Sequence, residues 1–122
     1  MAVNLIGGTT SASAALAFNA QTGTTYTFVL ADADNKLITA SNAASQAYSI
    51  PTNATTAFPV GTQINLIQIG AGQVTVSAAT PGTTTVVSTG ATSASPKCRA
   101  QYSSITLVKR DTDSWYAIGD IS

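Results

Sequence analysis

The stretch that most constrains the fold is residues 63–78, in which two runs rich in β-branched side chains flank Gly70-Ala71-Gly72. β-Branched residues fit the pleated surface of a sheet, and glycine adopts the positive φ of a tight turn without strain. In the second run the apolar residues alternate with Thr75 and Ser77, which gives one apolar and one hydroxyl-bearing face. The first run is apolar on both faces, as in a strand that is buried on both sides or interrupted by a bulge. The pattern predicts a β-hairpin at the centre of a sheet.

Further segments have strand-like patterns and are separated by turns rich in Asp, Asn, Pro and Gly. With the two runs of the expected hairpin they make about 8 short strands, at residues 26–30, 36–39, 47–50, 63–69, 74–78, 84–88, 104–110 and 115–118. No long helical pattern interrupts them, and the last segment is expected to pair back on the one before it. We therefore expect an all-β fold, an antiparallel β-sandwich or barrel of jelly-roll type, formed by residues 24–122.

Residues 1–23 differ from the rest of the chain and are predicted to form an N-terminal arm. Its first apolar segment, residues 2–6, ends at Gly7-Gly8, and the region after it is rich in Ala and Ser. An arm of this kind either docks on a neighbouring chain or is a frayed terminus. In the first case its large apolar side chains make the contacts, and these candidates are Val3, Leu5, Ile6 and Phe18.

The charge balance limits the classes of partner that this chain can bind. It contains 5 basic and 5 acidic residues, and only 8% of its residues are charged, against about 25% in a typical domain. A neutral, charge-poor chain lacks the basic surface that binds nucleic acid or anionic membranes, and near-zero net charge favours association. We therefore expect a homo-oligomer that is part of an assembly and binds neither nucleic acid nor membrane.

Two further absences bear on where the chain is found. No run reaches the roughly 20 apolar residues of a membrane span, and no basic region precedes an apolar core near the first residue. These features favour a protein that is made and used in a cytoplasm, or a chain that has already been trimmed. Asn53-Ala54-Thr55 matches a glycosylation sequon, which we interpret as a chance match because no secretory signal accompanies it.

Side chains that could carry catalysis are scarce. The chain has no His, and all of its acidic residues are Asp, so an imidazole base is lacking. Cys98 lies between Lys97 and Arg99, but strand alternation sends both neighbours to the opposite face, which favours a structural thiol. Asp32-Ala33-Asp34-Asn35 starts like a calcium loop but lacks the later Gly and Glu, which favours a plain turn. We predict no enzymatic activity, no cofactor and no metal site.

Trp115 and Tyr116 are neighbours in the last expected strand and therefore point to opposite faces. A Trp in a short strand after a turn is typical of a core anchor, although it could also form a platform for a sugar ring. We interpret Trp115 as a core residue. Tyr116 is then the better candidate for a surface contact.

Two groups of motifs resemble those of a known protein module. The first is Phe58-Pro59-Val60-Gly61-Thr62, followed by Ile64, Gln68, Gly70, Gly72 and Val74-Thr75. The second is Gln101-Tyr102-Ser103, Thr106-Leu107, Lys109, Trp115 and Gly119-Asp120-Ile121, with Tyr26-Thr27, Leu30-Ala31-Asp32-Ala33 and Ile50-Pro51 ahead of both. With these motifs, residues 24–122 resemble a small β-sandwich module of tailed-bacteriophage structural proteins, which include capsid decoration (cement) proteins, head fibres and tail fibres.

The resemblance implies a non-enzymatic virion component that is often a homotrimer. We expect a capsid decoration protein that is assembled in the host cytoplasm, binds the major capsid protein at the capsid surface and stabilises its lattice. The alternative is a tail-fibre or head-fibre module that binds a host-surface glycan through its aromatic residues. A third hypothesis is a pilus-like subunit that is completed by the N-terminal strand of its neighbour.

Overall fold

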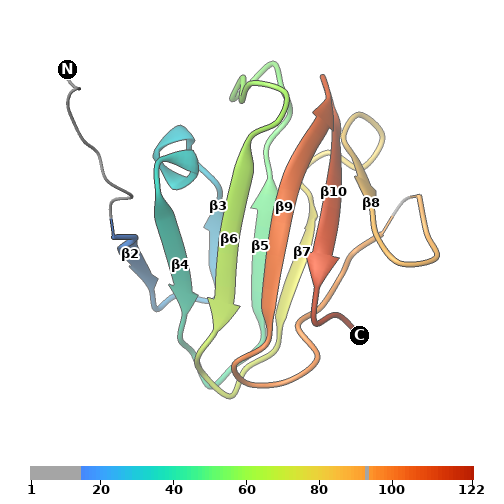
Figure 1. Ribbon diagram of the computed structural model, residues 1–122. Coiled ribbons are helices and arrows are strands. Elements are labelled where there is room, and N and C mark those ends of the chain that lie inside the picture. The colour runs from blue at the N-terminus through green and yellow to red at the C-terminus, as the bar shows by residue number, and fades with distance from the viewer. Residues whose placement is uncertain (1–14, 93) are drawn as a thin grey trace, which may run out of the picture.

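The computed structural model of this chain describes residues 15–92 and 94–122. The strands are β2 (Ala17–Gln21), β3 (Thr25–Thr27), β4 (Lys36–Ala40), β5 (Gln46–Ile50), β6 (Gln63–Gln68), β7 (Val74–Ala78), β8 (Thr85–Val87), β9 (Ser104–Asp111) and β10 (Ser114–Gly119). One short 3-10 helix, η1 (Leu30–Ala33), follows β3 (Figure 1). Strands β3 to β10 coincide with the expected strand segments, and the prediction of an all-β fold is confirmed.

The strands form two sheets that differ in size and in strand direction. The larger sheet has the order β2-β4-β6-β9-β10-β8, and the smaller has the order β3-β5-β7. Both pairs of the smaller sheet are parallel. In the larger sheet β9 is antiparallel to β6 and β10, whereas β2–β4, β4–β6 and β10–β8 are parallel. The expectation of antiparallel sheets is therefore wrong, because one sheet is mixed and the other is parallel.

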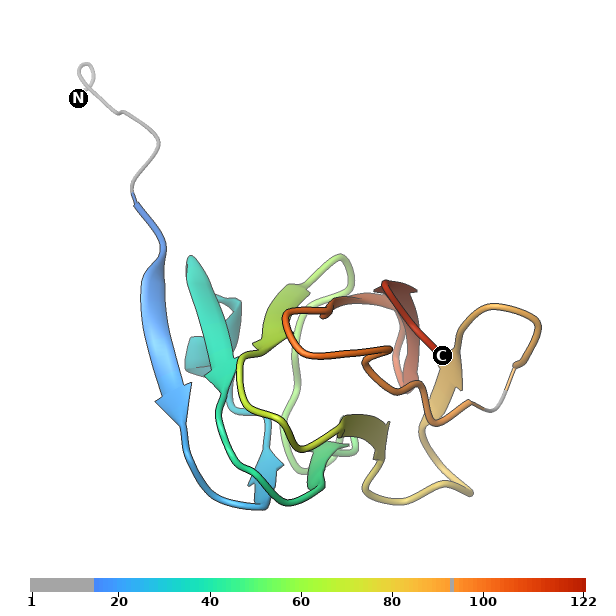
Figure 2. The same cartoon turned by 90° about the horizontal axis from the view of Figure 1, so that it is seen from below.

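The parallel pairs arise because the chain alternates between the two sheets. Strands β2, β4 and β6 lie in the larger sheet, and each is followed by its partner in the smaller one, β3, β5 or β7. Successive strand pairs stack in register, with Ile38 beside Leu66 in the larger sheet and Tyr26 beside Tyr48 in the smaller one. In Figure 2 the two sheets are seen as two layers. Only β9 and β10 form the antiparallel hairpin that was expected at the end of the chain.

The central hairpin expected at residues 63–78 is wrong, because β6 and β7 lie in different sheets. The residues between them carry the chain from one layer to the other, against the turn at residues 42–44. A Cβ atom on Gly72 would lie 1.8 Å from the carbonyl oxygen of Ala44, and one on Gly70 would lie 2.5 Å from the backbone nitrogen of Asn42. Neither glycine has a positive φ. Because these glycines have no side chain, the segment between β6 and β7 can touch the turn at residues 42–44. Neither glycine is needed for a tight hairpin turn.

The core lies between the two sheets and takes alternate residues from each strand. Along β9, Ile105, Leu107 and Lys109 are buried, while the residues between them are partly exposed. Trp115 is 1% exposed and packs edge-to-face on Phe58, with ring centroids 5.4 Å apart. The interpretation of Trp115 as a core residue is therefore confirmed.

The first strand pair closes one end of the core with a polar network. Asp32 is buried, and its carboxylate accepts hydrogen bonds from the Tyr26 hydroxyl at 2.7 Å, the Asn19 amide at 2.8 Å and the Val29 backbone nitrogen at 2.9 Å. The expected strand at residues 26–30 is shorter in the structure, because the chain turns into η1. The turn expected at Asp32 is thus a helical turn in which the carboxylate faces inward.

The expected N-terminal arm, residues 1–23, lies only partly within the described residues. Residues 17–21 form β2, which pairs along its whole length with β4. This part of the expected arm is therefore an edge strand of the larger sheet. The sequence pattern missed β2 because its residues, Ala-Phe-Asn-Ala-Gln, show no alternation of apolar and polar side chains.

Candidate interaction surface

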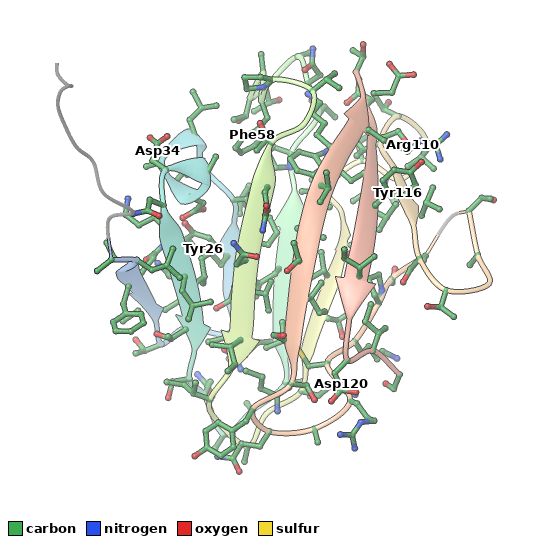
Figure 3. All side chains as sticks on the ribbon, viewed as in Figure 1. Tyr26, Asp34, Phe58, Arg110, Tyr116 and Asp120 are labelled. Atoms are coloured by element: carbon green, nitrogen blue, oxygen red, sulfur yellow. The ribbon has the colours of Figure 1, made fainter. Side chains whose placement is uncertain are left out.

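The outer face of the larger sheet, the side that points away from the core, carries the exposed large side chains of the strands. Strand registers align its residues in rows across the sheet. One row joins Phe18, Leu37, Asn65, Thr106 and Ile118. Because these residues alternate with the buried ones, they share one face, which points toward the viewer in Figure 3.

A second row crosses the same face closer to the other end of the strands. It joins Gln63, Val108, Tyr116 and Val87. Its side chains are apolar, aromatic or uncharged amides, as are most of those in the first row. The outer face therefore offers hydroxyl, amide and hydrocarbon groups to a partner and few charges.

Four large apolar or aromatic side chains of this surface are strongly exposed. Phe18 is 71% exposed, Ile118 55%, Leu16 49% and Tyr116 44%. Phe18 lies on the edge strand β2 and Ile118 lies on β10, with three strands between them in the sheet. At about 4.8 Å per strand, this separation is about 19 Å. A surface of this width suits a protein partner better than a small ligand.

Arg110 is the one charged residue among the outward-facing positions of the described strands. Its guanidinium lies 5.2 Å from the centroid of the Tyr116 ring, close enough for a cation–π contact, and Figure 3 shows the two side chains together. At an exposed site such a contact contributes about 0.5–1 kcal/mol. The contact also covers one face of the tyrosine ring.

The structure places two of the predicted interaction residues on one surface. Phe18 and Tyr116 lie on the same face of the larger sheet, on β2 and β10. The other predicted residues, Val3, Leu5 and Ile6, lie outside the described residues. Sequence reasoning missed Ile118, although it has the same parity as Tyr116 in the same strand and the alternation rule could have found it.

Several polar groups away from this surface are engaged in structure. Cys98 is 0% exposed, and burial raises the pKa of its thiol to about 11. This direction is opposite to the lowered pKa that activates a nucleophilic cysteine. Its neighbour Arg99 forms a two-point ion pair with Asp120, at 2.8 and 2.9 Å, and these hydrogen bonds lower the pKa of the Asp120 carboxyl.

No protein-family model, curated protein or solved structure gives a significant match to this chain. Within residues 15–92 and 94–122, no group of three or more metal-ligating side chains is placed to hold a metal ion. The same part of the chain has no helix that is long and apolar enough to cross a membrane. The outer face of the larger sheet is the candidate interaction surface of the described residues.

Proposed function

We propose that this chain is a non-enzymatic structural protein of a tailed-phage virion. In this proposal its two sheets form a small β-sandwich module that decorates the capsid. The module binds the major capsid protein and holds neighbouring capsid subunits together from the outer surface. The motif resemblance of residues 24–122 supports the class of protein, and a homotrimer is the assembly that this class favours.

The observation that carries the proposal is the uncharged, partly apolar outer face of the larger sheet. Monomeric proteins rarely leave wide apolar surface without a partner. Burying an exposed Phe or Ile side chain contributes about 1.5–3 kcal/mol, and Phe18, Ile118, Leu16 and Tyr116 are all available. On a capsid lattice many such modest contacts act together, and this multivalency retains the protein strongly.

Binding to capsids that lack this chain tests the proposal directly. Purified protein is mixed with such capsids, and the bound fraction is measured by sedimentation. Phe18→Ser and Tyr116→Ser should each weaken binding about tenfold, which corresponds to about 1.4 kcal/mol. Val60→Ser is the matched control, because Val60 is 64% exposed but lies in the turn before β6, outside the outer face.

Two results would contradict the decoration proposal. Wild-type protein that fails to bind such capsids would remove its basis. Equal binding of Phe18→Ser, Tyr116→Ser and Val60→Ser would show that another surface makes the contact. The copy number per virion gives a separate check, because a decoration protein is present in far more copies than a fibre or tail part.

The second candidate function is a fibre module that binds a host-surface glycan. The observation that favours it is the stacked pair of Tyr116 and Arg110, since an exposed aromatic ring beside a guanidinium can contact both the face and the hydroxyls of a sugar. Glycan-array binding that is lost in Tyr116→Ala would support this function. Binding to capsids without any glycan binding would exclude it.

A further inference from the structure

Lys109 is an unusual buried amine. It is 2% exposed, although lysine is almost never fully buried unless it is paired. The ion pairs of the described residues include Arg99–Asp120 and none that involves Lys109. Its ammonium instead donates to the side-chain oxygen of Asn53 at 2.6 Å and to the backbone oxygen of Phe58 at 2.7 Å.

The surroundings of this amine are aromatic and firmly held. The ring of Trp115 lies 5.9 Å from Nζ, and the Phe58 ring packs on the same tryptophan. The backbone nitrogen of Lys109 donates to Thr62 at 2.9 Å, and its backbone oxygen accepts from Gly61 at 2.8 Å. Side chain and main chain thus both attach strand β9 to the loop between β5 and β6.

A second contact, made by the backbone of Asn53, holds this residue beside the amine of Lys109. The backbone nitrogen of Asn53 donates to the Asp113 carboxylate at 2.7 Å, and Thr84 donates to the same oxygen at 3.3 Å. A carboxylate is therefore fixed next to the asparagine that faces Lys109. Lys109 and Asp113 belong to the β9–β10 hairpin, Asn53 belongs to the loop between β5 and β6, and the fold brings the two parts together.

The hydrogen bond limits the distance between the two atoms that could react. The Nζ of Lys109 lies 2.6 Å from Oδ1 of Asn53, and a C=O bond is about 1.23 Å long, so Nζ lies at most about 3.8 Å from the amide carbon Cγ. This approaches the 3–3.5 Å of a reactive contact, and fixed neighbours react with very high effective concentrations. We propose that Lys109 and Asn53 form an isopeptide bond within the folded chain.

The reaction balances without an oxidant, a reductant or a further reactant. One proton passes from the ammonium to the hydrogen-bonded Oδ1 of Asn53, and the lone pair that this frees on Nζ attacks Cγ, so that the Nζ–Cγ bond forms and the Cγ–Nδ2 bond breaks. One of the three protons of the lysine ammonium stays on the new amide nitrogen, and two move to Nδ2, which leaves as ammonium. The remaining amide N–H keeps the hydrogen bond to the Phe58 carbonyl.

This bond goes beyond the proposed function and does not depend on it. It would attach the loop between β5 and β6 covalently to β9, across the top of the core. The cross-link would hold the larger sheet and this loop together after local unfolding. It would therefore be useful in any assembly that is exposed to mechanical load or protease.

The intact mass of the purified, folded chain tests the proposal. Wild type should be lighter than its sequence mass by one ammonia, and Lys109→Arg and Asn53→Ala should both have their full sequence masses. Lys97→Arg is the matched control, because Lys97 is exposed, and this variant should still lose ammonia.

Peptide mapping fixes the position of the bond. Trypsin cannot cleave after a lysine whose amine is acylated, so peptide 37–97 should appear joined to peptide 100–110. Wild-type protein that keeps its full sequence mass after long incubation in the folded state would overturn the proposal. A loss of ammonia located in any other pair of peptides would overturn it equally.

Discussion

Two neighbouring tyrosines of the smaller sheet differ in the hydrogen bonding of their hydroxyl groups, and this difference predicts opposite effects of substitution by Phe. Tyr26 and Tyr48 are register partners in β3 and β5, with ring centroids 5.4 Å apart. The Tyr26 hydroxyl donates to Asp32 at 2.7 Å and accepts from Asn19 at 3.0 Å. The Tyr48 hydroxyl is buried and has no hydrogen-bond partner among the described residues. We expect Tyr48→Phe to stabilise the fold and Tyr26→Phe to destabilise it.

The magnitudes follow from the partners of each hydroxyl. An unpaired buried polar group costs about 1–3 kcal/mol, so Tyr48→Phe should raise the free energy of unfolding by about 1 kcal/mol. A hydrogen bond to a charged group contributes about 1.5–3 kcal/mol, so Tyr26→Phe should lower this free energy by about 2 kcal/mol. Tyr26→Phe also removes one of the donors that solvate the buried Asp32 carboxylate. The two variants should therefore differ by about 3 kcal/mol.

Urea unfolding at pH 7, followed by the fluorescence of the single tryptophan, Trp115, measures both effects. The protein concentration is kept constant, because any self-association would add to the apparent stability. Equal slopes of free energy against urea are needed for the comparison. A loss of more than about 1 kcal/mol in Tyr48→Phe would refute the reasoning, because it would mean that this hydroxyl has a partner.

Three further predictions concern glycine contacts, alkaline stability and the buried thiol. Gly72→Ala should cost about 3 kcal/mol or more in urea unfolding because of its contact with the Ala44 carbonyl, whereas Gly82→Ala, with open space around it, should stay within about 1 kcal/mol of wild type. Burial raises the pKa of Cys98 from 9.0 to about 11 and that of Tyr48 from 10.0 to about 12. Folding favours the neutral thiol and the neutral phenol, so the free energy of unfolding should be at its full value below pH 9 and fall between pH 9 and 12. Tyr48→Phe should reduce the fall in the upper part of this pH range. A curve for Tyr48→Phe that runs parallel to the wild-type curve would contradict this prediction. A thiol-reactive disulfide reagent at pH 8 should label Cys98 in urea but not in the folded chain, and equal rates would show that the thiol is accessible.

Strand positions and core residues were predictable from local patterns. In β7 the apolar residues at Val74 and Val76 alternate with hydroxyl-bearing ones, and the structure buries both valines. The same rule separated buried Trp115 from exposed Tyr116. Alternation succeeds because successive Cβ atoms of a strand point to opposite faces, whichever strand lies beside it.

The candidate surface and the lysine site were predictable only in part. Tyr116 was expected to be exposed, and Phe18 was expected to make contacts, but their position on one face depends on the pairing of β2 with β4. Lys109 has the same parity as Leu107, a sign of burial that the sequence analysis did not use. Its partner Asn53 lies in a loop far away in sequence, and no local pattern connects the two.

By itself, the sequence determined an all-β chain, the approximate ends of most strands and, for several strands, the side that faces the core. Only the tertiary structure decided which strands are neighbours, so that Gly70 and Gly72 mark a crossing between sheets where a hairpin was expected. The physical reason is that side-chain alternation is a local property, whereas pairing depends on backbone groups that are nearly the same in every residue. Close contacts between distant segments, such as a glycine against a carbonyl or an amine against an amide, then select one arrangement.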